Sequence, residues 1–288
     1  MWRLNIGVVV AMDEIAKRRQ AYAAEIARRA DAGDPRIEAA FAAVPREDFA
    51  GPPPWRIGSG GLSGQTTSDD PARLYEDVLV AIDAKRRINN GQPSLHAQSI
   101  EALALKQGDT VVQIGAGAGY YTAILAHLVG PAGQVFAYEV EPVIAGRAKA
   151  NLARCLQVEV RARSGVEDLP PAEAVYVNAA ATHPLRAWLD ALKVGGRLLF
   201  PLQAEHSTGA MLLITRPAQS DLWPARFLTP IVFIACEGGQ DPAMARRLEE
   251  AFRRGGSGRV RSLRFGGAPS GSDWLRGDGW TLSADPVD

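Results

Sequence analysis

The chain has 288 residues, of which 47% are hydrophobic and 22% are charged. This is enough to bury one large core and to leave residues for additional peripheral segments, which is consistent with an ordinary cytosolic enzyme. Its 32 basic and 32 acidic residues balance to a formal charge of zero, which indicates no polyanion-binding surface, and nucleic acid binding is not expected. The cysteines, Cys155 and Cys236, lack metal-ligand spacing, so we expect reduced thiols and no metal site.

Residues 1–50 are predicted to form a helical N-terminal part. The apolar stretch 4–12 is too short to span a membrane and lacks a small-residue cleavage site, so neither a membrane segment nor a targeting segment is expected. The pattern favours Met12 as the initiator and Asp13 as the cap of a helix that runs to about residue 33.

A second N-terminal helix is predicted over Ile37–Val44, because Pro45 follows it. The next stretch, residues 51–73, is rich in proline, glycine and serine. This composition favours turns and offers little apolar surface to bury, so it predicts a long loop or linker, which could act as a lid.

Residues 74–215 are predicted to form the main domain, an α/β fold in which strands and helices alternate over a doubly wound parallel sheet. In such a sheet the carboxyl ends of the strands share one edge, where ligands bind. The expected strands lie at about 110–114, 134–138, 157–162, 174–179 and 196–201, and the expected helices lie near 120–129, 142–154 and 184–192.

Three alternating glycines, Gly115, Gly117 and Gly119, follow the first of these strands and open a helix. Glycine permits positive φ and a close approach of a ligand to the backbone, and Glu139, after the next strand, can accept hydrogen bonds from ribose hydroxyls. A dinucleotide fingerprint would need glycine where this chain has Tyr120, so the spacing favours S-adenosylmethionine. A glycine turn that binds nothing is the alternative.

Residues 216–288 are predicted to form a C-terminal extension, with a strand-like stretch at 226–236 and a helix-like stretch at 242–254. Such an extension could shape a substrate pocket or form a contact between subunits.

Several motifs recur in this chain in the order of one known family. The motifs are Val44–Phe49, Tyr75–Asp77, Gly91-Gln92, Ile114–Tyr120, Glu139 and Gly195–Pro201. Over residues 37–203 the chain resembles the protein-L-isoaspartate O-methyltransferases. The resemblance implies a Rossmann-like class I methyltransferase fold and transfer of the methyl group of S-adenosylmethionine, leaving S-adenosylhomocysteine, to a carboxylate of an isomerised aspartyl residue.

The resemblance also implies a cofactor site. The glycine turn and the tyrosine after it would surround the methionine end, Glu139 would hold the ribose, and the corner at Ser164 would face the adenine. Asn178 ends a strand on the same edge. The expected cofactor-binding residues are Gly115, Gly117, Gly119, Tyr120, Glu139, Ser164, Gly165 and Asn178.

The acceptor loop departs from the family pattern, because Pro93 replaces a threonine and Leu95 replaces a serine. A leucine side chain can neither donate nor accept a hydrogen bond. The remaining polar candidates for the catalytic role are Asn90, Ser94 and His183.

Each polar residue of this loop also has a purely structural explanation. Asn90 and Ser94 could form a capped turn that opens a helix over Leu95–Leu105. His96, in the first turn of that helix, could act as a neutral base, although a surface or partly packed histidine is the more common case.

The leading hypothesis is an S-adenosylmethionine-dependent O-methyltransferase acting on isoaspartyl residues. One alternative keeps the cofactor but takes another protein group or a small molecule as acceptor, another is a catalytically silent cofactor-binding module, and a nicotinamide dehydrogenase is disfavoured by Tyr120. The expected partner is a protein, peptide or small-molecule methyl acceptor, and binding to nucleic acid or to a membrane is not expected. The chain could form an oligomer, and the expected location is cytoplasmic.

Overall fold

The computed structural model describes residues 6–58, 65–205 and 207–287, with side chains from residue 14 onward. The helices are α1 Ile6–Arg29, α2 Pro35–Ala43, α3 Glu47–Ala50, α4 Pro93–Leu103, α5 Tyr120–Val129, α6 Pro142–Asn151, α7 Arg186–Ala191 and α8 Pro242–Arg254, with short 3-10 turns η1 Pro71–Leu74 and η2 Ser257–Arg259. None of the described helices combines the length and the apolar character that a membrane span requires.

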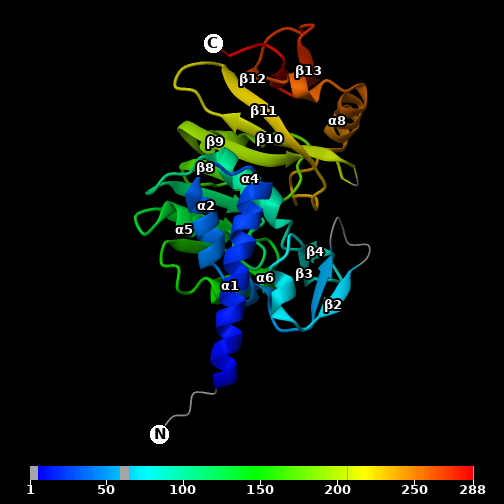
Figure 1. Ribbon diagram of the computed structural model, residues 1–288. Coiled ribbons are helices and arrows are strands. Elements are labelled where there is room, and N and C mark those ends of the chain that lie inside the picture. The colour runs from blue at the N-terminus through cyan, green and yellow to red at the C-terminus, as the bar shows by residue number, and fades with distance from the viewer. Residues whose placement is uncertain (1–5, 59–64, 206, 288) are drawn as a thin grey trace.

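A ten-stranded sheet forms the centre of the molecule, in the order β13-β14-β12-β11-β10-β9-β8-β5-β6-β7 (Figure 1). Its strands are β5 Thr110–Ile114, β6 Gln134–Tyr138, β7 Val158–Arg161, β8 Ala172–Val177, β9 Leu192–Leu202, β10 Gly209–Thr215, β11 Leu222–Ile231, β12 Ser262–Phe265, β13 Asp273–Arg276 and β14 Trp280–Ser283. The strands from β5 to β9 pair in parallel, which confirms the predicted doubly wound α/β fold.

The parallel strands bury both faces, as alternation along β5 shows. Val111 packs into a core shared with α1, α2, α4 and α5, whereas Val112 packs into a second core shared with α7 and α8. In register, Ile114 at the end of β5 lies beside Tyr138 of β6 and Val177 of β8. The segments that follow these three strands therefore share one edge of the sheet.

The C-terminal extension continues the central sheet. The strands β10, β11, β12, β14 and β13 pair antiparallel in that order beyond β9, and α8 covers one face of them (Figure 1). The strand predicted at 226–236 begins earlier, at Leu222, and ends at Ile231. Residues 232–236 leave β11 and run along the carboxyl edge of the sheet, where Ala235 bridges Ala180 in parallel.

The predicted cap at Asp13 is wrong, because α1 begins at Ile6 and passes through that position. The helix also ends earlier than expected, at Arg29. Asp31 has φ +51°, and the side chain of Asp34 caps the next helix by accepting a hydrogen bond from the Arg36 amide at 2.9 Å. The break between α1 and α2 therefore depends on backbone and capping features that the apolar periodicity does not show.

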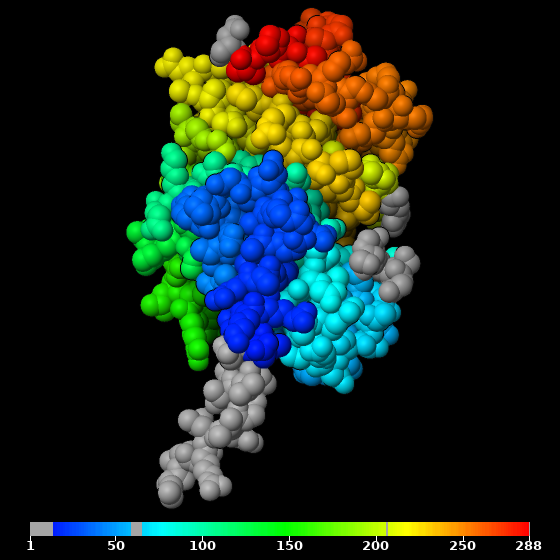
Figure 2. Space-filling model, viewed as in Figure 1, coloured from blue at the N-terminus to red at the C-terminus, as the bar shows by residue number. Residues whose placement is uncertain are grey.

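The loop predicted at 51–73 is only partly irregular, and this is a second correction. It contains β1 Trp55–Gly58 and β2 Thr66–Ser68, which join β3 Leu79–Asp83 and β4 Ile88–Asn89 in a four-stranded sheet of order β2-β1-β3-β4. Residues 59–64 of this stretch lie outside the described residues. The small sheet stands beside α1 as a separate lobe of the molecular surface (Figure 2).

A small core holds the described part of this stretch. Trp55 and Ile57 on β1 pack against Leu74, Val78 and Val80, and all five side chains are buried. These three partners, of which Val80 lies on β3, follow the proline-rich segment and supply the apolar surface that its own composition lacks.

A buried arginine fastens this lobe to the main core. Arg46 precedes α3 and is 2% exposed, and its guanidinium donates hydrogen bonds to the backbone carbonyls of Leu74, Glu76 and Val78. The same group lies over the rings of Tyr22 and Tyr120, at 5.7 and 5.5 Å from their centroids. One side chain therefore connects α1, α5 and the chain entering β3.

Candidate functional site

A cleft of about 840 Å³ opens at the carboxyl edge of the parallel strands. Its walls come from the turn after β5, the start of α5, the β3–β4 hairpin, the loop entering α4, and residues 230–235 after and at the end of β11. These segments are far apart in the sequence, and the sheet topology brings them together. This is the edge at which open α/β sheets bind ligands.

The glycine turn forms the floor of the cleft and has the backbone that its sequence predicts. Gly115, Gly117 and Gly119 have φ +77°, +57° and +95°, values that side chains with a Cβ rarely adopt. A Cβ on Gly119 would come within 2.7 Å of Leu152 Cδ1, whereas Gly117 faces the cleft with only Ile82 Cδ1 at 3.1 Å. The turn is therefore closed on the protein side and open toward the cleft.

Glu139 follows β6 and lies directly against this turn. Its Oε2 accepts a hydrogen bond from the Gly117 amide at 2.8 Å, and its Oε1 accepts one from the Glu141 amide at 3.0 Å. Burial raises the pKa of this carboxyl, and the backbone donors partly oppose the shift. Each oxygen has a second lone pair that can accept a ribose hydroxyl.

The Ser164-Gly165 corner follows β7, whose last residue, Arg161, accepts a hydrogen bond at its carbonyl from the Glu139 amide at 3.1 Å. Neither residue of the corner lines the cleft among the described residues. The Gly165 carbonyl accepts the Trp188 indole N–H at 2.9 Å, and a Cβ on this glycine would come within 2.7 Å of Ile114. The corner therefore lies beyond β7 and outside the main cavity, and its role at the adenine end stays a prediction.

Asn178, after β8, lines the cleft on the opposite side of the glycine turn from Glu139. Its Oδ1 accepts from the Gln113 side chain at 2.8 Å, and the Thr122 hydroxyl donates to Gln113 Oε1 at 2.7 Å. Thr122 was not singled out from sequence, although its partner Gln113 lies only nine residues earlier, on β5. This buried series fixes the orientation of the Asn178 amide.

Ser94, a predicted catalytic residue, is turned away from the cleft. Its amide and its hydroxyl both donate to the Asp77 carboxylate, at 2.9 and 2.7 Å, and the Gln92 side chain donates to the same carboxylate at 2.9 Å. Asp77 therefore caps the start of α4 from a distant segment. In this arrangement Ser94 positions the acceptor loop.

The other two catalytic candidates occupy different places. Asn90 lines the cleft, and its Oδ1 accepts a hydrogen bond from the Val80 amide at 2.8 Å. His183 is half-buried outside the cleft lining, with its Nδ1 3.1 Å from the Thr182 hydroxyl. Burial lowers the pKa of His183, and the nearby Asp241 opposes that shift. The structure thus brings only Asn90 of these two to the cleft.

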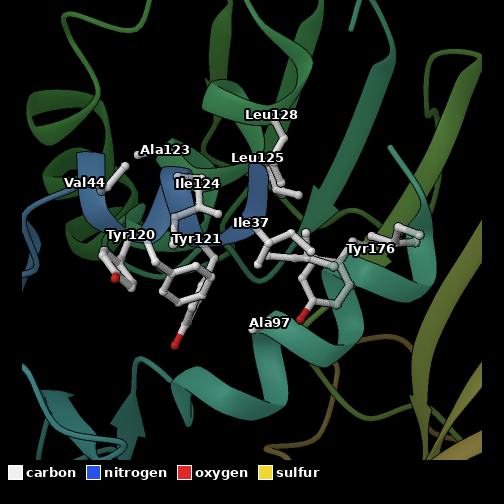
Figure 3. Packing of buried hydrophobic residues seen from close by; sticks show 14 of the residues in the cluster. Ile37, Val44, Ala97, Tyr120, Tyr121, Ala123, Ile124, Leu125, Leu128 and Tyr176 are labelled. Carbon is white, nitrogen blue, oxygen red and sulfur yellow. The ribbon is translucent and has the colours of Figure 1, made fainter. Parts of the chain in front are cut away.

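His96 is buried rather than on the surface, with 2% exposure, and it lines the cleft beside Leu95. Its ring stacks on Tyr121 with 3.6 Å between centroids, and its Nδ1 lies 2.7 Å from the Tyr176 hydroxyl. Tyr121 and Tyr176 both point toward α4 in Figure 3. Burial, with a smaller contribution from the positive charge of Arg46, lowers the pKa of His96 to about 3, so the imidazole is neutral at physiological pH.

Because the His96 imidazole is buried in its neutral form, we expect the free energy of unfolding to fall in acid. The unfolded chain binds a proton at His96 below a pKa of about 6.5, whereas the folded chain does so only near about 3, so stability is lost as pH falls below 6.5. Between pH 7.5 and pH 5 the loss from this residue is about 2 kcal/mol. In denaturant titrations at both pH values, His96→Asn should lose correspondingly less stability on acidification.

His127, exposed on α5, provides the matched control. The pH dependence of His127→Gln should run parallel to that of the wild type. If His96→Asn also ran parallel to the wild type, burial of a neutral imidazole would not be the source of the acid sensitivity.

No group of three or more histidine, cysteine, aspartate or glutamate residues in the described ranges is arranged to hold a metal ion. Both cysteines are free thiols. Burial raises the pKa of each, and that of Cys236 reaches about 11.

Two solved structures share the fold. One, a protein-L-isoaspartate O-methyltransferase, aligns with a TM-score of 0.64 and 24% identity over 86% of this chain and 72% of its own. A second, from Plasmodium falciparum, is described as a protein-L-isoaspartate O-methyltransferase β-aspartate methyltransferase in complex with S-adenosyl-L-homocysteine; it has a TM-score of 0.60 and 18% identity over 76% of this chain and 98% of its own. These likenesses establish the class I methyltransferase fold.

Sequence comparisons show the family. A protein-L-isoaspartate O-methyltransferase of Rhodopseudomonas palustris is 34% identical over 224 residues, which cover 74% of this chain and 92% of that protein. One of Ignicoccus hospitalis is 33% identical over 165 residues, which cover 56% of this chain and 76% of that protein. The sequence model of the family "Protein-L-isoaspartate(D-aspartate) O-methyltransferase (PCMT)" matches residues 65–240, more than half of the chain. The chain therefore belongs to this family and is an S-adenosylmethionine-dependent O-methyltransferase.

Proposed function

We propose that the chain methylates the carboxylate of isoaspartyl residues in a protein or peptide, with S-adenosylmethionine held on the turn Gly115–Gly119. The main support for this cofactor position is the hydrogen bond from the Gly117 amide to Glu139 at 2.8 Å. It holds a carboxylate that can accept hydrogen bonds from ribose hydroxyls beside an open glycine turn. Ser164 and Gly165 would stand at the adenine end. Tyr120 and Asn178, which both line the cleft, would stand at the methionine end.

The residues at the methyl-acceptor end of the cleft favour a methyl acceptor that is already ionised. When bound, S-adenosylmethionine supplies an activated methyl group, so the protein's task is to position the acceptor and exclude water. His96 is the only histidine among the described lining residues, and burial lowers its pKa to about 3, so it is a weak proton acceptor at neutral pH. A carboxylate needs no such base, whereas a hydroxyl or amine acceptor does.

A second candidate function is methyl transfer to a different acceptor. Its support is the apolar surface around Leu95, which stands where the family has a serine, together with Tyr121 and Phe233 in the same wall. This surface could accommodate an apolar small molecule or another protein group. The two candidates share the cofactor and differ only in what enters beside it.

Transfer of labelled methyl from S-adenosylmethionine to an isoaspartyl peptide tests the proposal, with the normal aspartyl peptide and a cofactor titration in parallel. We expect selective labelling of the isoaspartyl peptide. Cofactor binding without labelling of either peptide would reject the isoaspartyl acceptor and favour the second candidate or a silent module.

Replacing Glu139 with glutamine should lower the affinity for S-adenosylhomocysteine by about 10- to 100-fold, because hydrogen bonds to a charged carboxylate are worth about 1.5–3 kcal/mol. The amide also offers one acceptor oxygen where the carboxylate offers two. Calorimetric titration measures the effect. Glu159→Gln, at an exposed carboxylate on β7, is the control and should bind normally. Equal affinities in the two variants would remove Glu139 from the ribose site.

A further inference from the structure

The β3–β4 hairpin, residues 79–89, is fastened beside the glycine turn. Arg86 forms an ion pair with Glu141, two residues beyond Glu139, and Arg147 of α6 donates to the Ile82 carbonyl at 3.1 Å. A Cβ built on Gly117 would lie 3.1 Å from Ile82 Cδ1, so this side chain of the hairpin reaches over the turn. The hairpin is thus a fixed wall of the cleft.

One arginine of this hairpin has no partner in the described part of the chain. Arg87 lines the cleft and is exposed, and its guanidinium takes part in no ion pair, side-chain hydrogen bond or cation–π contact there. The adjacent Arg86, by contrast, is neutralised by Glu141. The hairpin therefore presents one uncompensated cation to the cleft.

The backbone at Arg87 is unusual for such a residue. It has φ +59°, in the left-handed region where a side chain with a Cβ costs about 1 kcal/mol or more. Glycine or asparagine would relieve this cost. An arginine thus occupies a backbone position that favours glycine.

The surroundings define the chemistry that this guanidinium could bind. Across the cleft, Ile231, Val232 and Phe233 form an apolar wall, and Val232 is 75% exposed. Glu205, after β9, is the one acidic residue among the described lining residues, and it already has an interaction of its own. An arginine fork and an apolar wall that line the same cleft fit a carboxylate carried on a partly apolar molecule.

We propose that Arg87 is the anchor for the carboxylate-bearing acceptor, so that the β3–β4 hairpin takes over acceptor binding where Leu95 has replaced the serine of the acceptor loop. This inference rests on the proposed function. The hairpin leads through Asn89 and Asn90 directly into the acceptor loop, so Arg87 and the loop line the same cleft. The neutral lining residue Asn90 then orients the acceptor, and Arg87 supplies the charge.

Two carboxylates could reach this guanidinium: that of the acceptor and that of the cofactor's methionine end. The test therefore measures the KM for an isoaspartyl peptide, the affinity for S-adenosylhomocysteine, and the binding of the peptide to protein saturated with S-adenosylhomocysteine. Three variants are compared. Arg87→Gly relieves the backbone strain and removes the charge, Arg87→Lys keeps the charge without the fork, and Arg56→Ala removes an exposed arginine on β1 outside the cleft lining.

We expect Arg87→Gly to raise the KM and the peptide dissociation constant about tenfold or more, with kcat within about twofold and S-adenosylhomocysteine affinity unchanged. Arg87→Lys should recover part of the loss, and Arg56→Ala should match the wild type. The wild-type KM should rise with ionic strength, and that of Arg87→Gly should not. A gain in thermal stability of Arg87→Gly would show that the kinetic loss is not caused by misfolding.

Each contrary result has a distinct meaning. An unchanged KM in Arg87→Gly, with an active wild type, overturns the anchor and leaves the proposed function standing. A loss of S-adenosylhomocysteine affinity in Arg87→Gly overturns it in favour of the cofactor carboxylate. A wild type that neither binds nor methylates the isoaspartyl peptide overturns both the anchor and the proposed function.

Discussion

Replacing Arg46 with methionine is expected to lower the free energy of unfolding by about 3–5 kcal/mol. The guanidinium is 2% exposed, and without it the carbonyls of Leu74, Glu76 and Val78 lose the donors that they have in the folded core. Each buried carbonyl left without a donor costs about 1–3 kcal/mol, which methionine's apolar surface only partly offsets.

Denaturant titration, followed by both tryptophan fluorescence and circular dichroism, measures the effect of this substitution. Arg73→Ala is the matched control, since the pair between Arg73 and Glu76 is exposed and its loss should cost less than about 0.5 kcal/mol. If both variants were destabilised equally, the buried arginine would not be what joins the small sheet to the main core. A loss confined to Arg46→Met supports its role.

Gly117→Val is expected to lower the affinity for S-adenosylhomocysteine by about 100-fold or more. Valine is β-branched and costs about 1–2 kcal/mol at φ +57°, and its methyl groups would occupy the cleft beneath Ile82. Movement of the backbone to relieve this strain would also break the contact between the Gly117 amide and Glu139. The steric and electrostatic losses therefore act on the same ligand.

Gly146→Ala is the control for this experiment, because the position lies within α6 and a Cβ there meets nothing within 4 Å. It should bind normally and gain up to about 1 kcal/mol of stability from helix propensity. Circular dichroism establishes whether Gly117→Val is folded. Normal cofactor affinity in folded Gly117→Val would contradict the placement of the cofactor on this turn.

The strands and the glycine turn could be predicted because their signals are local. The apolar run Thr110–Ile114, ended by alternating glycines, specifies a buried strand and a turn without reference to the rest of the chain. Glu139 could be found as well, since it follows the next such run. These parts of the site depend on residues that are neighbours in sequence.

The features that sequence did not predict depend on distant partners. Trp55 and Ile57 become a strand core only through β3, and Ser94 turns away from the cleft only because Asp77 accepts both of its hydrogen bonds. His96 is buried because Tyr176, on a strand eighty residues further along, meets its Nδ1. A composition window or a short motif contains none of these partners.

With its antiparallel extension, the ten-stranded sheet has one edge at β13 and the other at β7. The outermost strands are β7 and β13, each four residues long, and they carry charged residues: Glu159 and Arg161 on β7, Asp273 and Arg276 on β13. Short, charged edge strands pair poorly with another chain's backbone. The ten-stranded sheet should therefore resist edge-to-edge pairing even when the protein is concentrated. The cleft lies away from both of its edges, midway along the sheet.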